Sequence, residues 1–472
     1  MPQRRSHVAP SAAQSDLAAA LVELRVEIDA PTEFSPEALA EAEAASAPEP
    51  ELDLREVPFV TLDPAGSKDL DQAFHLERIG GGFEVRYAIA DVPSFVTPGG
   101  AVDAEARLRG QTLYLADGSI PLHPRVLSED RASLLPDVER PALVWTFCLD
   151  DGGAVSEFRL ERALIRSRAQ LDYVAAQAAL DRGEEGPITL LRDVGLLRQV
   201  QEASRGGASL NLPDEEVVQK EDGTYGIERR HPLPIEDWNA QLSLMTGMAA
   251  AELMVDARVG VLRTMPAPDE RAFARFRHQT EALGRPWTDG GYGEYLRSLD
   301  RADSLTLPVL EAAASLFRGA GYVTFDGSVP DDIEQAAIAA PYAHATAPLR
   351  RLVDRWSLAI CLAVSNGQEA PSWARDSLAE LPELMQQSGQ RASRLNADTI
   401  NRVEAALLRP LVGQAIEATV IEMRGEDRAA VQIAEPAVTA TAPVPAGTAP
   451  GETLSVRLVS TDIAKGMVEF AA

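Results

Sequence analysis

The order of apolar patterns along the chain restricts its fold more than any other feature. Short apolar runs typical of strands begin at residue 57, and the runs 57–62 and 83–90 are separated by Gly80-Gly81-Gly82, which indicates a hairpin. From Leu171 to about Arg409 helical patterns dominate, and short strand-like runs return after that. Because strands and helices come in separate blocks rather than in alternation, the sequence predicts an α+β fold with mixed sheets and surrounding helices.

Three parts are expected along the chain: a short helical segment with a linker over 1–51, a large domain over 52–408 and a small β-barrel over 409–472. In the first part, apolar residues recur at helical spacing after Ser15, which predicts a helix over 15–28 with Ser15 as its N-cap. Ser35, followed by Pro36, predicts the start of a second short helix. In the last part, short strands are parted by Pro and Gly turns at 415–422, 429–433, 454–458 and 467–470. This pattern predicts a barrel of the oligonucleotide-binding type.

The formal net charge of −28 limits the kinds of partner the chain can bind. Phosphate binding depends on clustered Lys and Arg, so a broad nucleic-acid-coating surface is excluded and any such site must be an enclosed channel. The sequence contains no run of about 18 apolar residues, and its start lacks the apolar stretch of a signal peptide. We therefore expect a soluble cytoplasmic protein without membrane contact.

Three aspartates, Asp63, Asp69 and Asp71, follow a buried strand within nine residues. Hard cations such as Mg²⁺ prefer oxygen ligands, and carboxylates at a strand end and on the returning loop can converge on one point. A metal ion there would support phosphodiester cleavage, because it polarises the phosphoryl group and lowers the pKa of a bound water. The alternative is structural: Asp63 with Pro64 opens a turn, and Asp69 caps it. A phosphoesterase that acts on small molecules is a further hypothesis for the cluster alone.

Four separated blocks of sequence add to this cluster: Thr61-Leu62-Asp63-Pro64 with Asp69-Leu70-Asp71, Arg109-Gly110-Gln111-Thr112-Leu113-Tyr114-Leu115, Ile235-Glu236-Asp237-Trp238, and Tyr342-Ala343-His344-Ala345-Thr346-Ala347-Pro348-Leu349-Arg350-Arg351. In this order they resemble the catalytic domain of the ribonuclease II and ribonuclease R (RNB) family. The resemblance spans about residues 52–405, and the C-terminal barrel stands where the family carries its S1 domain. About 50 residues precede the large domain, so a short form without the N-terminal cold-shock domains is expected.

The resemblance implies a 3′-to-5′ exoribonuclease that hydrolyses RNA processively to nucleoside 5′-monophosphates. It implies Mg²⁺ as the cofactor, with Mn²⁺ as a substitute, and a monomer that acts on the 3′ ends of single-stranded RNA. By the same resemblance, Asp63, Asp69 and Asp71 match metal-binding positions, and Asp71 and Arg350 match catalytic ones. Arg350 and Arg351 match arginines that contact RNA, although a solvated pair at a helix start is the structural alternative.

Three further residues match RNA-contacting positions of the family. Tyr114 matches an aromatic that packs against a base near the 3′ end, which suits any sequence because every base has a π-face. Tyr173 corresponds more loosely to a second such tyrosine, and Glu236 to an acidic residue near the terminal nucleotide. For these two, a packed helix residue and a first-turn carboxylate explain the sequence equally well. For Tyr114 the alternative is a half-buried strand tyrosine.

Two positions depart from the family pattern. Gln72 stands where the family has a further aspartate, so a neutral amide replaces one carboxylate. This departure motivates an alternative hypothesis, namely a catalytically weak or inactive relative that binds RNA. Val217, after Leu212-Pro213-Asp214, stands where a phenylalanine is expected, and a valine could wall a channel but could not stack on a base.

Overall fold

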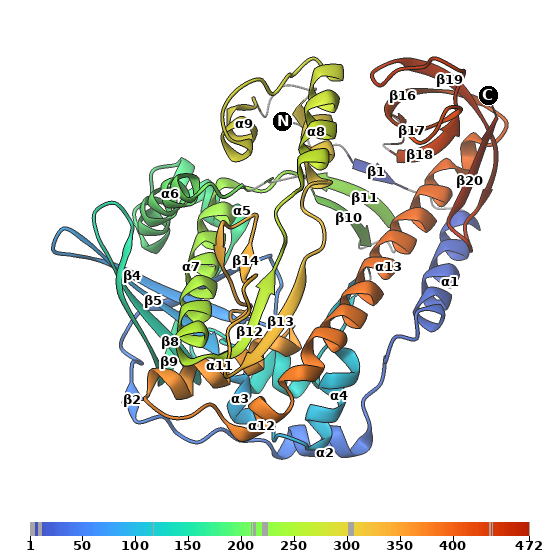
Figure 1. Cartoon of the computed structure of the whole chain (residues 1–472). Coiled ribbons are helices and arrows are strands. Elements are labelled where there is room, and N and C mark those ends of the chain that lie inside the picture. The colour runs from blue at the N-terminus through green and yellow to red at the C-terminus, as the bar shows by residue number, and fades with distance from the viewer. Residues whose placement is uncertain are drawn as a thin grey trace.

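A six-stranded sheet with strand order β2-β9-β3-β4-β5-β8 forms the centre of the large domain. Its strands are β2 (Leu52–Asp53), β3 (Phe59–Asp63), β4 (Gln72–Ile79), β5 (Gly82–Ala90), β8 (Glu139–Leu149) and β9 (Val155–Asp172). The 18-residue strand β9 pairs with β3 along one edge and with β8 along the other. Strands β3, β4, β5, β8 and β9 therefore close into a ring, which is a small barrel (Figure 1).

Helices surround this sheet in the part of the chain that the structure describes, which is residues 5–7, 12–116, 118–208, 210, 214–219, 225–300, 306–433, 436 and 438–471 of a computed structural model. The helices are α1 (Ala12–Glu27), α2 (Pro36–Ala44), α3 (Val92–Phe95), α4 (Ala101–Arg109), α5 (Tyr173–Asp181), α6 (Pro187–Arg205), α7 (Pro234–Ala257), α8 (Glu270–Ala282), α9 (Tyr292–Ser298), α10 (Thr306–Ala314), α11 (Leu352–Ser365), α12 (Ser372–Asp376) and α13 (Leu381–Leu408). Short helical turns occupy Leu127–Arg131, Leu378–Glu380 and Arg409–Leu411.

Smaller sheets complete the large domain. β1 (Arg5–His7), β11 (Tyr225–Arg230) and β10 (Asp214–Gln219) form a three-stranded sheet, and the remaining strands form antiparallel pairs. These pairs are β6 (Leu113–Leu115) with β7 (Gly118–Ile120), β12 (Val259–Thr264) with β13 (Gly321–Asp326), and β14 (Glu334–Gln335) with β15 (Ala340–Pro341).

Both faces of the central sheet are buried, because successive side chains of a strand point to opposite faces. Tyr87 and Ile89 of β5 belong to the core cluster that includes α7 and α11. Ala88 and Ala90, which alternate with them, belong to a second cluster that includes α2. The large residues face the long helices and the alanines allow the other layer to approach closely, so the strand ends are held between two packed layers.

The last strands form a separate barrel of five strands in the order β18-β17-β16-β19-β20. Their bounds are β16 (Ala415–Met423), β17 (Arg428–Ile433), β18 (Val438–Pro443), β19 (Thr453–Asp462) and β20 (Met467–Ala471). The 28-residue helix α13 leads from the large domain to this barrel, and α1 lies along α13 (Figure 1). The first helix is thus packed between segments that follow it by almost 400 residues.

The predicted α+β fold with a C-terminal barrel is confirmed, while several element boundaries differ. The first helix begins at Ala12, so Ser15 lies inside it and is not its cap. Ser35 does cap α2, because its side chain accepts a hydrogen bond from the Ala38 N–H. The glycine turn at Gly80 joins β4 to β5, and β4 was not foreseen because its polar residues interrupt the apolar pattern.

Two other strand groups were missed. Strands lie within the region of helical patterns, for example β12 and β13, where short apolar runs cannot be told from buried helix by periodicity. The barrel strand β18 was missed because its sequence, VTATAP, ends in proline. Among the described residues, no helix has both the length and the apolar character needed to cross a membrane.

Candidate active site

Asp63 is the last residue of β3, and a tight turn follows it. The Ser67 N–H donates to the Pro64 carbonyl at 3.2 Å, and Gly66 has a φ of +84°, in the left-handed region that glycine adopts without strain. The structural alternative for Asp63 and Pro64 therefore holds in part, since this is a turn. The turn also reverses the chain and brings Asp69 and Asp71 back toward the end of β3.

Ser133 fixes the returning loop. Its hydroxyl donates to the Lys68 carbonyl at 2.6 Å and accepts from the Leu70 N–H at 2.9 Å. The neighbouring Leu134 N–H donates to the Leu70 carbonyl at 3.0 Å. The loop carrying the aspartates is thus bonded on both sides of Leu70, which leaves the side chains of Asp69 and Asp71 in fixed positions.

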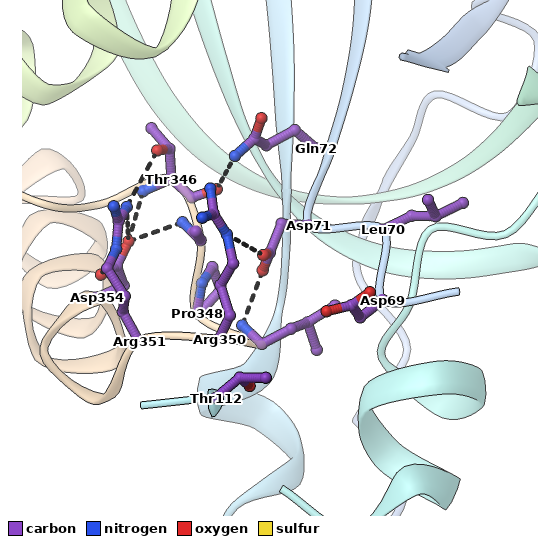
Figure 2. A network of polar contacts seen from close by, with 12 residues as sticks. Asp69, Leu70, Asp71, Gln72, Thr112, Thr346, Pro348, Arg350, Arg351 and Asp354 are labelled. Atoms are coloured by element: carbon purple, nitrogen blue, oxygen red, sulfur yellow. Dashed lines mark hydrogen bonds and ion pairs between the residues drawn. The ribbon is translucent and has the colours of Figure 1, made fainter. Parts of the chain in front are cut away.

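Asp71 lies at the meeting point of two distant segments (Figure 2). Its carboxylate is 4% exposed, and Oδ1 accepts the Leu349 N–H at 2.7 Å. Arg350 Nε lies 3.4 Å from Asp71 Oδ2, and the Arg350 side chain is 43% exposed. One end of the guanidinium therefore faces the buried carboxyl group of Asp71 while the rest remains accessible to an anion from solvent.

Asp354 fixes the backbone of the segment that leads to Arg350. The buried carboxylate accepts the Thr346 N–H at 2.8 Å and the Ala347 N–H at 2.7 Å. Arg351 donates to both Asp354 oxygens at 2.9 Å. The Arg351 guanidinium is thus committed to this pair and is not brought to Asp71 (Figure 2). Its contact with RNA stays a prediction, and its observed contacts are those of a group that orders the loop.

Tyr114 is presented by the short hairpin of β6 and β7. The Thr112 N–H donates to the Arg350 carbonyl at 3.0 Å, and the Leu352 N–H donates to the Gly110 carbonyl at 3.0 Å, so the lead into the hairpin runs beside the Arg350 segment. Tyr114 is 58% exposed, and its hydroxyl donates to Asp69 Oδ2 at 3.2 Å. Its ring is open enough to stack on a base, which a fully packed strand tyrosine could not do.

Tyr173 also lies near the carboxylates. It follows Asp172, which pairs with Asp63 across β3 and β9, and its hydroxyl accepts from Asn239 Nδ2 at 3.1 Å. Burial, followed by the negative charge of Asp63, raises the pKa of Tyr173 to about 12. The phenol is therefore neutral at physiological pH and lies close enough to Asp63 to feel its charge.

Glu236 has the contacts of a helix cap. Its carboxylate accepts the Leu233 N–H at 2.8 Å at the start of α7, and Arg230 donates to it at 2.5 and 2.9 Å. The structural alternative of a first-turn carboxylate thus describes what is seen. Its role near a terminal nucleotide stays a prediction, although its charge also contributes to the raised pKa of Tyr173.

Gln72 is bonded at both ends of its amide. Its Nε2 donates to the Thr346 carbonyl at 2.6 Å, and its Oε1 accepts from the Tyr87 hydroxyl at 2.9 Å. Tyr87 in turn shares a hydrogen bond of 2.8 Å with Ser243 of α7. An ionised carboxylate at this position could not donate to a carbonyl, so the surroundings of residue 72 require an amide.

The other departure, Val217, lies in β10 away from the aspartate loop. Its partly buried side chain packs against the cluster formed by α1, α13 and the C-terminal barrel. Leu212 and Pro213, by which Val217 was placed against the family pattern, lie outside the described residues.

Burial dominates the electrostatics of the two innermost aspartates. It raises the pKa of Asp71 to about 8, and Arg350 opposes that shift. Burial raises the pKa of Asp63 to about 7, with the negative charge of Asp69 as the second cause. Oδ2 of each residue is buried without a hydrogen-bond partner in the described structure. Both carboxyl groups are buried and both feel the charges of Asp69 and Arg350. Buried carboxylates with too little positive charge around them are groups that a cation would stabilise.

The three aspartates do not converge as a complete ligand set. In the part of the chain described, no three Asp, Glu, His or Cys side chains come close enough together to hold a metal ion. Asp69 is instead turned to the Tyr114 hydroxyl. The donors still fit Mg²⁺, which is commonly bound through one or two carboxylates with waters and substrate phosphates supplying the rest. Asp63 and Asp71 are the residues that would hold it.

Sequence reasoning missed the groups that hold the site together. Ser133, Tyr87 and the Leu349 N–H have no local pattern that predicts their bonds, because their partners lie 63, 15 and 278 residues away. Asp354 stands close to the Arg350 block in sequence, and an acidic residue three positions after an arginine on a helix was a usable signal.

Family models match most of the chain. Residues 51–360 match the model of the RNB domain, and residues 414–472 match the RNase II-type exonuclease C-terminal S1 domain. The chain is 30% identical over 324 residues to a probable exosome complex exonuclease RRP44 of Caenorhabditis elegans, covering 65% of this chain and 34% of that protein. It is 25% identical over 404 residues to ribonuclease R of Escherichia coli, covering 79% and 49%. The chain thus matches between a third and a half of these relatives' length.

Solved structures agree on the fold. Mycoplasma genitalium RNase R in complex with ribose-methylated single-stranded RNA superposes with a TM-score of 0.86 at 18% identity, covering 97% of this chain and 78% of that one. Yeast Ssd1, described as a pseudonuclease, superposes with a TM-score of 0.69 at 16% identity, covering 90% and 55%. Because one neighbour is named a nuclease and the other a pseudonuclease, the fold alone does not decide whether a member cleaves RNA.

Proposed function

This chain belongs to the family defined by the RNB domain, and from that premise we propose that it is a 3′-to-5′ exoribonuclease. It hydrolyses single-stranded RNA processively to nucleoside 5′-monophosphates. The observation that carries the proposal is the contact of Asp71 with Arg350 at 3.4 Å, which joins a buried carboxylate and an accessible guanidinium beside Tyr114. That set combines groups for water activation, phosphate binding and base stacking in one place.

In the proposed reaction, the 3′-terminal base stacks on Tyr114 and its phosphate lies against Arg350. The guanidinium balances the charge that develops on the phosphoryl oxygens. Asp71, in its ionised form, orients a water molecule toward phosphorus. The water oxygen forms a new bond to phosphorus and the bond from phosphorus to the 3′ oxygen of the preceding nucleotide breaks. The water gives up one proton, and the leaving 3′ oxygen takes up one proton, so the protons balance. A nucleoside 5′-monophosphate leaves, and the RNA is one nucleotide shorter.

Mg²⁺ is the proposed cofactor, with Mn²⁺ as a substitute, and it would polarise the phosphoryl group and lower the pKa of a bound water. Asp63 and Asp71 are its proposed ligands among the described residues, because each keeps a buried oxygen without a hydrogen-bond partner. Asp69 lies close enough to raise the pKa of Asp63, so it adds negative charge that favours a cation.

A second candidate is a protein that binds RNA 3′ ends without cleaving them. The neutral Gln72 motivates it, since one carboxylate of the family pattern is missing. Against this candidate, the Gln72 amide is engaged with Tyr87 and Thr346 rather than left facing the aspartates. The change at this position is therefore accommodated by the surrounding loop without displacing Asp71 from Arg350.

Incubation of the purified protein with 5′-labelled single-stranded RNA and Mg²⁺ tests both candidates. The exoribonuclease shortens the 5′-labelled RNA from its 3′ end. A processive enzyme converts the full-length RNA to short end products with few intermediates, whereas a distributive enzyme leaves a ladder of intermediate lengths. Binding of the RNA with undiminished full length after long incubation with Mg²⁺ or Mn²⁺ would instead establish the second candidate. A parallel reaction with a 3′-tailed duplex shows whether structured RNA stops the enzyme.

The remaining features of the proposal concern organisation. We propose three units, a helical segment over 1–51, the RNB domain over 52–408 and the S1-like domain over 409–472, acting as a monomer in the cytoplasm. Support for a reducing compartment comes from Cys148 and Cys361, which are both free thiols.

A further inference from the structure

The helix α1 makes two separate buried contacts. Near its start, Leu17 and Leu21 belong to the cluster shared with the end of α13 and the C-terminal barrel. Toward its end, Leu24 and, directly after the helix, Ile28 belong to a different cluster. These two residues are 0% and 7% exposed, so the second contact is as closed to solvent as a domain core. This second cluster contains Leu395 of α13, and it also includes a partner that belongs neither to α13 nor to the barrel.

That second partner is the hairpin that carries Tyr114. The cluster around Leu24 and Ile28 includes Leu113 of β6 and Ile120 of β7. Because side chains alternate along a strand, Leu113 and Tyr114 point to opposite faces of the hairpin. The apolar face packs into the cluster with Leu24, Ile28 and Leu395 of α13, and the other face presents Tyr114 to Asp69.

A buried arginine joins the same two segments a second time. Arg109 is 2% exposed, and its guanidinium donates to the carbonyls of Pro31 at 2.5 Å and Glu33 at 2.6 Å, just after α1. The same group donates to the Pro121 carbonyl at 3.3 Å, just after β7, and its centre lies 3.6 Å from the centroid of the Phe34 ring. The exit of α1 and the exit of the hairpin are thus fixed to one cation.

A hairpin of this size needs such support. Each of its strands has three residues, and a two-stranded hairpin is at best marginally stable without a packing partner. We infer that α1 is a positioning element for Tyr114, with Leu24 and Ile28 holding the β6–β7 hairpin so that the tyrosine ring meets the 3′-terminal base. The inference rests on the proposed function, and it assigns the first helix a part in the active site that lies outside the RNB match at 51–360.

The effect of loosening α1 should depend on RNA length. Stacking on one aromatic contributes most when few other contacts hold the strand, so we expect Tyr114→Ala to lower kcat/KM roughly tenfold for an RNA of about five nucleotides and about twofold for one of about thirty. Leu24→Ala should reproduce this selective loss for the short RNA. If α1 acts through Tyr114, adding Leu24→Ala to Tyr114→Ala should change kcat/KM by less than about twofold.

Two variants of the same helix serve as matched controls. Leu17→Ala removes a buried leucine from the cluster shared with the end of α13 and the barrel, to which the hairpin contributes Ala116 of its turn rather than Leu113 or Ile120. It should lower kcat/KM for both RNA lengths to a similar small extent. Val26→Ala alters a side chain that is 78% exposed and should leave both values unchanged. If Leu24→Ala instead matches Leu17→Ala, or adds its full effect to that of Tyr114→Ala, the inference is overturned and α1 only stabilises the fold.

Ile28→Val keeps the test available if Leu24→Ala does not fold, because it removes one methylene group and costs little stability. It should produce a smaller loss in the same direction, again confined to the short RNA. If the wild-type protein cleaves no RNA, the proposed function fails by itself. The same double-mutant comparison is then made on the affinity for a short fluorescent RNA without Mg²⁺, where non-additivity between positions 28 and 114 supports the inference and additivity overturns it.

Discussion

The chain contains two small β-barrels with opposite chemistry. In the RNB domain, Asp63 ends strand β3 of the ring and Asp71 directly precedes β4. Each has a raised pKa and a buried carboxyl oxygen without a hydrogen-bond partner in the described structure. The C-terminal barrel, over 409–472, has five Lys and Arg against eight Asp and Glu, and Phe470 is its sole aromatic residue. Phe470 is 7% exposed, so it offers no stacking surface.

The two barrels differ in role: we expect the first to carry RNA cleavage and the second mainly to pack against the helices. Aromatic stacking and cationic contacts are the two means by which proteins grip single-stranded nucleic acid. The exposed Tyr114 lies in the RNB domain, whereas the C-terminal barrel has exposed arginines such as Arg428 and Arg457 but no exposed aromatic side chain among its described residues. The C-terminal barrel instead packs against α13 and α1, where Arg409 forms an ion pair with Asp16. We expect substitutions in the first barrel to affect RNA cleavage strongly and those in the second to affect it weakly.

The largest effect is expected from Asp71→Asn. The amide keeps the shape of the side chain but cannot orient water as an anion or hold a cation, so kcat should fall by about a thousandfold or more. Single-turnover decay of labelled RNA measures it, with Asp462→Asn in the C-terminal barrel as the matched control. An unchanged rate in Asp71→Asn would contradict the view that the first barrel carries the catalytic residues.

Arg350→Lys should come next. A lysine keeps the charge but loses the planar group that can contact Asp71 and a phosphate at once, which we expect to lower kcat by roughly a hundredfold. Arg457→Lys in the C-terminal barrel is the control and should stay within about twofold. Equal losses of kcat in the two variants would mean that both barrels bind the phosphates of the RNA.

The pH dependence of stability distinguishes the barrels without RNA. Folding raises the pKa of Asp71 to about 8 and of Asp63 to about 7, above the ordinary 3.8. The unfolded chain therefore releases these protons first, and stability falls as pH rises from about 4 to about 8. Asp71→Asn should stabilise the metal-free protein at pH 8 by on the order of 3 kcal/mol. Thermal unfolding at pH 5 and pH 8 measures it, and Asp462→Asn should show no such difference. A destabilised Asp71→Asn protein at pH 8 would contradict the sign.

The smallest effect is expected from the double variant Arg428→Gln, Arg457→Gln. If the C-terminal barrel makes few phosphate contacts, RNA affinity should change by less than about threefold. Each lost phosphate contact would reduce the slope of log affinity against log salt by about 0.7 for a single strand. Fluorescence anisotropy across a salt series measures both quantities. A slope reduced by more than about 1 would show that this barrel does grip RNA.

The sequence predicted the α+β class, the C-terminal barrel and the neighbourhood of the site because each depends on local patterns or on matched blocks. Asp71, Arg350 and Tyr114 were named from those blocks, and the structure brings them close together. The orientation of Asp69 toward Tyr114 and of Arg351 toward Asp354 was not predictable, because it depends on which of several nearby partners a side chain selects after folding. The function of α1 was equally hidden, since its partners lie far along the chain.

The position of α1 has a consequence for the timing of synthesis. Glu27 pairs with Arg402, and Asp16 with Arg409, so the groove that receives the helix is made of residues that follow it by 375 to 393 positions. At translation rates of about 5–20 residues per second, the helix waits roughly 20–80 s before that groove leaves the ribosome. During that interval the apolar residues that pack on α13 and the barrel, such as Leu17 and Leu21, are unprotected, although the Tyr114 hairpin has already been synthesised. A nascent chain would therefore complete the seat of α1, and with it the full support of Tyr114, only after α13 has been synthesised.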